Sequence, residues 1–124
     1  MQKTKGQLED TIVKRVTEFY AQKLGVGPEN ARAYIVEDMV IVRLQGKLLP
    51  IEAQLLDSHE GVDLVKKIRE RLDEAHSNEL KSIIANITGY QVTSVHADNS
   101  TKTGERFVTF MLDKNLAKEL ERVK

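Results

Sequence analysis

The chain has no cysteine and no tryptophan, and it contains only three tyrosines and three phenylalanines. The lack of cysteine excludes disulfides, thiolate zinc sites and cysteine nucleophiles, and it fits a reducing cytosol. The scarcity of aromatic side chains excludes the stacking platform on which many proteins bind single-stranded nucleic acid. With 124 residues, the chain can bury roughly two thirds of its unfolded surface as one domain, without a disulfide or a metal.

The chain also lacks an excess of either charge and any long apolar run. Nineteen lysines and arginines balance nineteen aspartates and glutamates, so the basic surface that attracts nucleic-acid phosphates is missing overall. No apolar run approaches the ~20 residues that span a bilayer. Residues 1–6 lead into a charged helix without the apolar segment of a signal peptide. We therefore expect a cytoplasmic protein, which can be peripheral at a membrane through protein partners.

Two halves of the sequence follow the same order of helix, glycine, strand, turn, strand and helix. The first half consists of a helix over residues 8–24, Gly25, strands over 31–36 and 39–44, and a short helix over 50–56. The second half consists of a helix over residues 62–87, Gly89, strands over 90–97 and 106–112, and a helix over 114–123. Because neither half has enough core to fold alone, we expect residues 1–124 to form a single domain. Its predicted class is α+β, with an antiparallel sheet of about four strands packed by helices.

Several residues mark the predicted ends of these helices. Thr4 and Gln7 fit a capping box at the start of the first helix, and Gly25 is a natural stop. Pro50 suits the first position of the short helix, where its missing amide costs nothing. Asp113 is a good N-cap for the last helix.

The long predicted helix over residues 62–87 has one apolar stripe before Ser77-Asn78 and another after it. The first stripe contains Val65, Ile68 and Leu72. A continuous helix of about 27 residues would be roughly 40 Å long, which exceeds the width of a domain of this size. Two alternatives follow. Either Ser77-Asn78 kinks the helix, or its overhang packs against a second copy of the chain in a homodimer.

Two groups of residues are candidates for binding an anion. If Glu37-Asp38 forms a two-residue turn, Arg32 faces Arg43 across the hairpin, an arrangement that flanking acids or a bound anion would make tolerable. The loop over residues 98–105 is long for a hairpin, and its hydroxyls, lysine and glycine can form an anion nest. Each group also has an ordinary interpretation. The arginines can be solvated or in another register, and the loop can be a simple connection.

His96 and Asp98 lie two residues apart on one predicted strand and so share a face. With Ser94 they could imitate a nucleophile, base and orienting acid. However, the sequence has no Gly-x-Ser-x-Gly nucleophile elbow, and its three histidines are too scattered to suggest a metal site. We therefore expect no enzyme, no metal and no cofactor, with a hydrolase-like use of His96 and Asp98 as the minor alternative.

Charged residues gather around the start of the long predicted helix. We interpret the acidic ones as partners of the helix dipole; they are Glu52, Asp57, Glu60 and Asp63. The basic ones alternate with acids, which is typical of a solvated helix face with salt bridges; they are Lys66, Lys67, Arg69 and Arg71.

Five segments carry a resemblance to a known family. They cover residues 5–9, 24–28, 38–46, 48–52 and 96–106, in this order along nearly the whole chain. Through them the chain resembles the bacterial MpsC family, formerly a domain of unknown function. The family is named for component C of a Na+-translocating system that generates a membrane potential. The chain departs from the family at Val26, where a basic residue is frequent, and at Leu49, where threonine is frequent.

The resemblance implies a small soluble partner of membrane transport subunits, linked to cation-coupled potential generation and uptake of dissolved inorganic carbon. It implies no catalytic residues. Our leading hypothesis is a non-enzymatic accessory or regulatory subunit. The alternative is an anion- or nucleic-acid-binding regulatory module in which Arg32, Arg43 and Lys102 bind the anion. The candidate interaction surface comprises Gly25, Gly27, Pro28, Arg32, Arg43, His96, Asp98, Ser100, Thr101, Lys102, Thr103, Gly104, Glu105 and Arg106.

Overall fold

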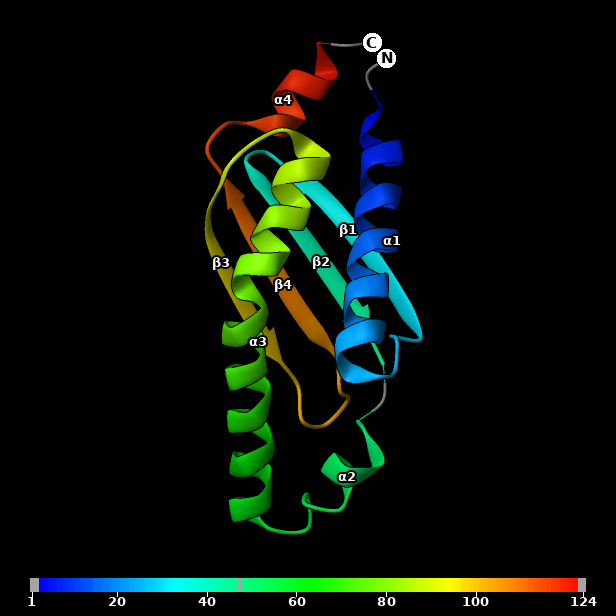
Figure 1. Ribbon diagram of the computed structural model, residues 1–124, viewed down its shortest axis with the longest axis vertical. Coiled ribbons are helices and arrows are strands. Elements are labelled where there is room, and N and C mark those ends of the chain that lie inside the picture. Colours follow the sequence, from blue (N-terminus) through cyan, green and yellow to red (C-terminus); the bar gives the residue numbers. More distant parts are fainter. Residues whose placement is uncertain (1–2, 47, 123–124) are drawn as a thin grey trace.

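The computed structural model describes residues 3–46 and 48–122. Its elements, in chain order, are α1 (Lys5–Leu24), β1 (Asn30–Val36), β2 (Met39–Gln45), α2 (Pro50–Ala53), α3 (His59–Thr88), β3 (Val92–Asn99), β4 (Arg106–Leu112) and α4 (Leu116–Glu121). The strands form one antiparallel sheet in the order β1-β2-β4-β3 (Figure 1). The predicted α+β class is confirmed.

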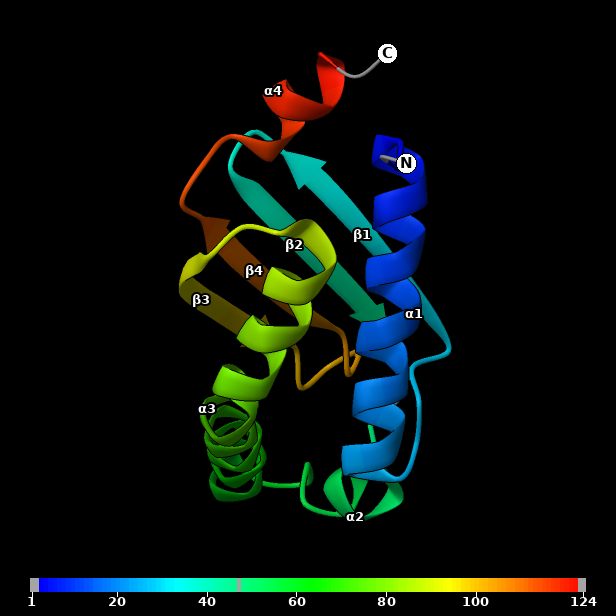
Figure 2. The same ribbon diagram turned by 45° about the horizontal axis from the view of Figure 1, so that its top comes forward.

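The long helices cover one face of the sheet. Figures 1 and 2 show α1 and α3 side by side on that face, with α1 over β1 and α3 over β3. On the opposite face the described residues place no helix, so the sheet is covered on one side only. None of the described helices is both long enough and apolar enough to cross a membrane.

The two sequence halves pair with each other through their second strands. β2 and β4 are neighbours at the centre of the sheet, and β1 and β3 form its two edges. α1 and α3 end in the same way, because Gly25 (φ 78°) and Gly89 (φ 77°) adopt the left-handed conformation that favours glycine. The expectation that both hairpins share one sheet is therefore confirmed.

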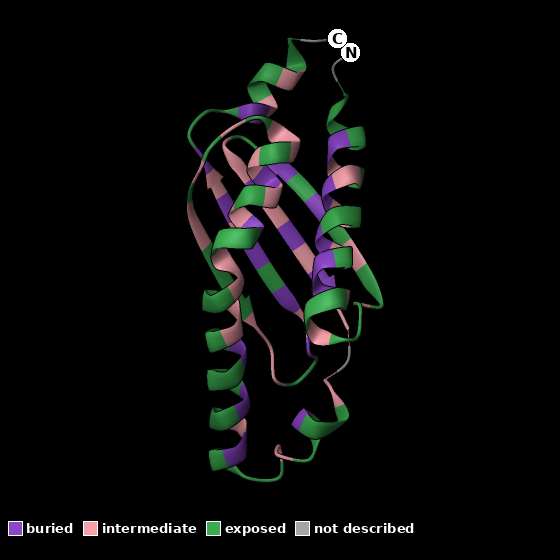
Figure 3. Cartoon of the chain, in the orientation of Figure 1, coloured by how far each residue is buried: buried purple, intermediate pink, exposed green. Residues whose placement is uncertain are grey.

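The hydrophobic core lies between the sheet and the two long helices. Alternate strand residues point to opposite faces, so each strand contributes its inward set to this core. Figure 3 shows the buried positions on the facing sides of the helices and strands. The most deeply buried large side chains are Ile12, Val16, Ile35, Val40, Val42, Val65, Leu80, Ile84, Val108 and Phe110.

The first hairpin has the predicted register, with Arg32 opposite Arg43 and Val36 opposite Met39. Glu37 adopts a positive φ of 55°, which is unusual for a residue with a side chain. The rest of the fold holds this turn in place. The Glu37 carbonyl accepts a hydrogen bond from the Ala117 amide at 3.1 Å, and the Asp38 carbonyl accepts one from Leu112 at 2.7 Å.

Several predicted boundaries were wrong. The short helix ends at Ala53 instead of residue 56 and continues as a turn. The last helix begins later than predicted, because its N-cap is Asn115, whose side chain accepts a hydrogen bond from the Lys118 amide at 2.9 Å. Its predicted end at residue 123 lies outside the described residues. β3 starts at Val92 and runs to Asn99, so the second hairpin loop contains only residues 100–105.

The long helix α3 is continuous through Ser77-Asn78, so of the two alternatives the kink is wrong. Its overhang beyond the sheet is the N-terminal half, which lies beside α2 at one end of the molecule (Figure 1). The predicted apolar stripe of this half was partly wrong. Ile68 is 43% exposed, whereas the neighbouring Arg69 is buried with 3% exposure.

Gly61 is the position where the start of α3 leaves no room for a side chain. A Cβ there would collide with the backbone carbonyl of Leu55, whereas a Cβ at Gly6 in α1 would meet nothing. We expect Gly61→Ala to lower the free energy of unfolding by about 1–3 kcal/mol, as overpacking does. Gly6→Ala should raise it by up to about 1 kcal/mol through helix propensity. Urea unfolding of both variants measures the difference. Equal effects would contradict the close approach at Gly61.

Candidate functional site

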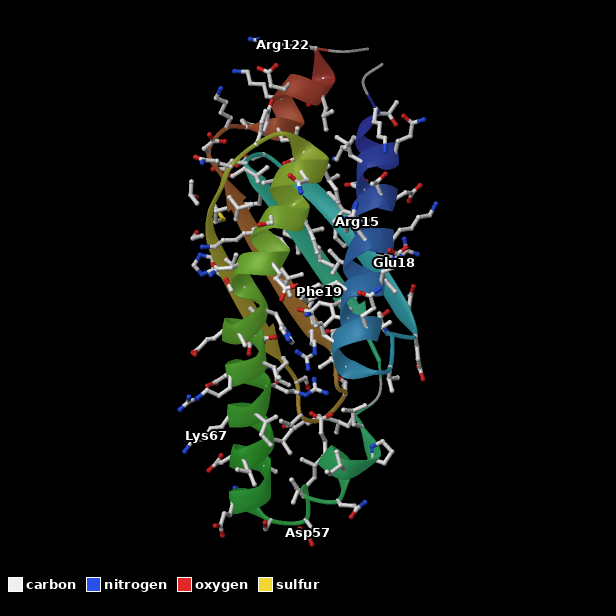
Figure 4. All side chains as sticks on the ribbon, viewed as in Figure 1. Arg15, Glu18, Phe19, Asp57, Lys67 and Arg122 are labelled. Carbon is white, nitrogen blue, oxygen red and sulfur yellow. The ribbon has the colours of Figure 1, made fainter. Side chains whose placement is uncertain are left out.

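A cavity of about 230 Å³ lies at the end of the sheet where the helix overhang begins. It is enclosed by the last turns of α1, the glycine turn that follows, the end of β2, the start of α2, one side chain of α3 and the start of β4. Figure 4 shows nitrogen-bearing side chains gathered in the interior between α1 and α3 at this level. The lining residues are Tyr20, Leu24, Val26, Gly27, Pro28, Glu29, Leu44, Gly46, Leu49, Glu52, Arg69, Gly104 and Arg106.

Arg69 of α3 is the central polar group of the cavity wall. Its Nε donates to Glu52 Oε2 at 2.8 Å, and its Nη2 donates to Glu52 Oε1 at 2.9 Å. Its Nη1 donates to the Gly104 carbonyl at 3.1 Å. One guanidinium therefore connects α3, α2 and the second hairpin loop, with the bidentate geometry that makes arginine–carboxylate pairs strong and specific.

Glu52 reaches this pair because α2 starts directly before it. Pro50 occupies the first turn of α2, and the Leu49 amide donates to Glu52 Oε1 at 2.8 Å. The carboxylate thus accepts from both the helix start and Arg69. The hydrogen bonds from Arg69 are the largest cause that holds the pKa of Glu52 below its ordinary value, so the carboxylate is charged at neutral pH.

A second buried arginine, Arg106 at the start of β4, lies next to Arg69. Its Nη1 donates to Asp73 Oδ1 at 2.9 Å, and its guanidinium lies over the Tyr20 ring, 5.6 Å from the centroid. Burial raises the pKa of Asp73, and the neighbouring Arg106 opposes that rise. The guanidinium is thus held by a carboxylate and an aromatic face together.

Among the described residues of this wall, Tyr20 is the buried one whose polar atom has no hydrogen-bond partner. The side chain is 2% exposed, and its hydroxyl makes no hydrogen bond to any described residue. Burial raises the pKa of Tyr20 to about 12, so the hydroxyl keeps its proton at neutral pH. Buried hydroxyls are normally hydrogen-bonded, so this hydroxyl is an exception among the described residues of the wall.

The structure places one part of the sequence-predicted surface around this cavity. Gly27, Pro28, Gly104 and Arg106 line it. Gly25 ends α1 just before the lining turn. The remaining loop residues belong to the short connection between β3 and β4 that brings Gly104 to Arg69; they are Ser100, Thr101, Lys102, Thr103 and Glu105.

Another part of the predicted surface lies elsewhere, on the uncovered face of the sheet. Arg32, His96 and Asp98 are exposed there. Arg43 lies on the same face, where its Nε donates to Glu105 Oε2 at 2.8 Å and its guanidinium lies over Phe107. An acid therefore already balances one of the two facing arginines. Ser94 Oγ lies 3.2 Å from His96 Nε2, but the side chain of Asp98 accepts from the Asn99 amide instead.

The predicted anion nest in the hairpin loop uses its own amides internally. Ser100 Oγ accepts from the amides of Lys102 and Thr103 at 3.2 and 3.3 Å. The Gly104 amide donates to the Ser100 carbonyl at 2.8 Å. The Glu105 amide donates to Thr103 Oγ1 at 3.2 Å. These bonds shape the loop so that the Gly104 carbonyl meets Arg69, and they leave these four amides occupied.

Two buried polar residues of the cavity, Glu52 and Arg69, were missed at the sequence level. Glu52 was assigned to the helix dipole and Arg69 to a solvated helix face, yet they are 7% and 3% exposed. A signal was present in the spacing, because Arg69 lies four residues after Val65 and three before Leu72, on the buried stripe of the helix. Lys67, in contrast, projects from α3 into solvent (Figure 4).

Comparisons with known proteins give one family and one close relative. Residues 4–114 match a family model described as "Na+-translocating membrane potential-generating system (MpsC)". The chain is 41% identical over 123 residues to "Uncharacterized protein YbcI" of Bacillus subtilis (strain 168), and the alignment covers 99% of each chain. No solved structure matches the chain.

We expect the Arg69–Glu52 pair to be essential for the stability of this end of the molecule. Glu52→Ala should lower the free energy of unfolding by about 3–5 kcal/mol, because it leaves a buried arginine without its counter-ion. Replacing both partners together, Glu52→Leu with Arg69→Met, should recover most of that loss. Urea unfolding measures each variant.

The matched control is Glu60→Ala, an exposed acid in the first turn of α3. Its loss should stay below about 1 kcal/mol, the usual range for a charge near a helix end. A Glu52→Ala variant as stable as Glu60→Ala would contradict the buried pair.

Proposed function

Because the chain belongs to the MpsC family, we propose that it is a non-enzymatic accessory subunit of a Na+-translocating system that generates a membrane potential. The observation that carries this proposal is the family match over residues 4–114. The proposal includes a cytoplasmic location, with the chain held at the membrane by transport subunits. It also includes a role in the uptake of dissolved inorganic carbon.

The contact surface that we propose for these subunits lies at the cavity end of the molecule. The glycine turn over residues 25–28 and the loop over residues 100–105 come from opposite halves of the sequence, and both border the cavity region. Lys102 is exposed in the loop, and Val26 is 59% exposed in the turn. Irregular, exposed segments on a rigid scaffold are where binding residues concentrate. The bond from Arg69 to Gly104 supplies the rigidity.

A second candidate function is an anion-binding regulatory module. The observation that favours it is Arg106, a buried arginine in the cavity wall whose side chain bonds through Nη1 to Asp73. The originally suggested pair, Arg32 with Arg43, supports it less, since Arg43 is bound to Glu105. Direct binding of nucleic acid has no such support, because lysines and arginines equal aspartates and glutamates in number.

The accessory role can be tested in membrane vesicles from cells that lack the chain. Addition of the purified chain should restore a membrane potential that requires Na+ and is absent with choline, measured by a voltage-sensitive dye. Lys102→Glu should restore much less, because it reverses the charge of the proposed contact loop. Lys14→Glu, an exposed site on α1 far from the loop, should restore the potential fully.

Two results would contradict the proposal. One is an unchanged Na+-dependent potential in vesicles without the chain. The other is equal loss of function in Lys102→Glu and Lys14→Glu, which would separate the activity from the proposed contact surface.

A further inference from the structure

We propose that the cavity beside Arg106 and Tyr20 is a binding site for a small organic carboxylate with a compact apolar body. This inference names a ligand class for the anion-binding alternative above, and it is independent of the accessory role because it depends on the shape and chemistry of the cavity alone. Its volume of about 230 Å³ exceeds the ~150 Å³ of a cavity that accommodates benzene. A ring or short chain that bears one carboxylate therefore fits.

The walls of the cavity select an apolar body. Leucine, valine and proline side chains make up much of its lining; they are Leu24, Val26, Pro28, Leu44 and Leu49. Leu44 is 3% exposed, whereas Val26 is 59% exposed. The apolar lining thus runs from the interior to the mouth, and a ligand that enters there loses contact with water along most of its length.

The polar groups of the lining select the carboxylate. The Tyr20 hydroxyl keeps its proton and has no hydrogen-bond partner among the described residues. The Arg106 side chain uses Nη1 in its bond to Asp73 and makes no other hydrogen bond within the described part of the chain. Its remaining N–H groups and the tyrosine O–H are donors, and an arginine N–H that meets a carboxylate forms a charge-assisted bond.

Of the other charged residues of the lining, Glu29, Glu52 and Arg69, the last two are already paired with each other and do not compete for this role. Arg69 directs Nε and Nη2 to Glu52 and Nη1 to Gly104. Both Glu52 oxygens already accept bonds, from Arg69 and from the Leu49 amide. The cluster that forms the cavity is therefore separate from the donors that would recognise the ligand.

Benzoate is a suitable probe, with benzamide and benzylamine as neutral and cationic analogues of the same shape. The full chain would be titrated with each compound up to about 20 mM at constant ionic strength, a range that detects millimolar dissociation constants. Methyl and amide NMR shifts report binding. We expect saturable shifts at Leu24, Leu44 and Leu49 with benzoate. Benzamide should bind about tenfold more weakly or worse, and benzylamine should not bind.

The Tyr20→Phe variant tests whether the cavity is a ligand-binding site or only a packing void. The variant removes a buried hydroxyl that has no partner, so it should fold and be at least as stable as the native chain. We expect it to bind benzoate about tenfold more weakly or worse. Tyr90→Phe, which lies outside the cavity lining, should bind normally. Val26→Trp at the exposed mouth should block entry, and it tests the site independently of Tyr20.

Several outcomes would overturn this assignment. The first is the absence of saturable shifts with benzoate. The second is binding of benzamide or benzylamine as tight as that of benzoate. The third is undiminished benzoate binding in Tyr20→Phe or Val26→Trp. A failure here leaves the vesicle potential unaffected, so it is distinguishable from a failure of the accessory role.

A second inference comes from the uncovered face of the sheet. Large apolar side chains lie there beside charged ones, and Tyr34, Val36 and Phe107 are 41%, 42% and 42% exposed. The register aligns this face in rows across the four strands. One row reads Arg32, Arg43, Phe107 and Asp98, so it is positive at the β1 edge and negative at the β3 edge.

We infer that this face packs against the same face of a second copy. A two-fold axis parallel to the strands places β1 of one copy over β3 of the other and keeps each row opposite itself. Arg32 then faces Asp98 of the second copy, and the pair occurs twice. An axis perpendicular to the strands would instead place the arginines opposite the apolar row of Val36 and Met39.

Reversing the charges of Arg32 and Asp98, singly and together, tests this interface. Light scattering at about 100 μM should show a dimer, since dimer populations depend on concentration. Arg32→Asp or Asp98→Arg alone should weaken the dimer at least fivefold through like-charge contacts. The double variant should restore it, and Lys14→Glu should have no effect. A monomeric native chain, or a dimer that neither single exchange weakens, would overturn the inference.

Discussion

The bidentate pair between Arg69 and Glu52 is the interaction on which the cavity end of this molecule depends. The central sheet and the C-terminal half of α3 share an apolar core, but the overhanging half of α3 extends beyond that core. Arg69 attaches this overhang to α2 and, through the Gly104 carbonyl, to the second hairpin loop. A buried pair of this kind adds little net stability compared with apolar packing, but it specifies one arrangement of the segments it joins.

That arrangement explains how two similar halves produce one asymmetric site. Each half supplies a helix, a glycine cap and a hairpin, and the halves meet at β2 and β4. The cavity then forms where the turn after α1 approaches the loop between β3 and β4, so residues from both halves line it. The family description, a Na+-translocating system, concerns an assembly. We propose that the turn over residues 25–28 and the loop over residues 100–105 contact the other subunits, and that the uncovered sheet face packs against a second copy.

The architecture was predictable because its signals are local. Helical and strand periodicities, the Thr4 capping box and the glycine stops each depend on neighbouring residues, and the structure has the capping box and both glycine stops. The site was less predictable, because burial of a charged residue depends on a distant partner. Ile51 is 70% exposed and Glu52 is 7% exposed, an inversion that only the position of Arg69 explains. The extension of β3 through Asp98 and Asn99 likewise depends on pairing with β4.

The most direct measurement of this account is side-chain NMR of the arginines at neutral pH. Arg69 should show an Nε–H proton that exchanges slowly with water, because that proton is buried and bonded to Glu52. Arg71, exposed on the same helix, is the internal reference and should exchange fast. The amide proton of Gly104 should also exchange slowly with water, as the Nε–H proton of Arg69 does. An Arg69 Nε–H that exchanges as fast as that of Arg71 would contradict the buried pair and the cavity built around it.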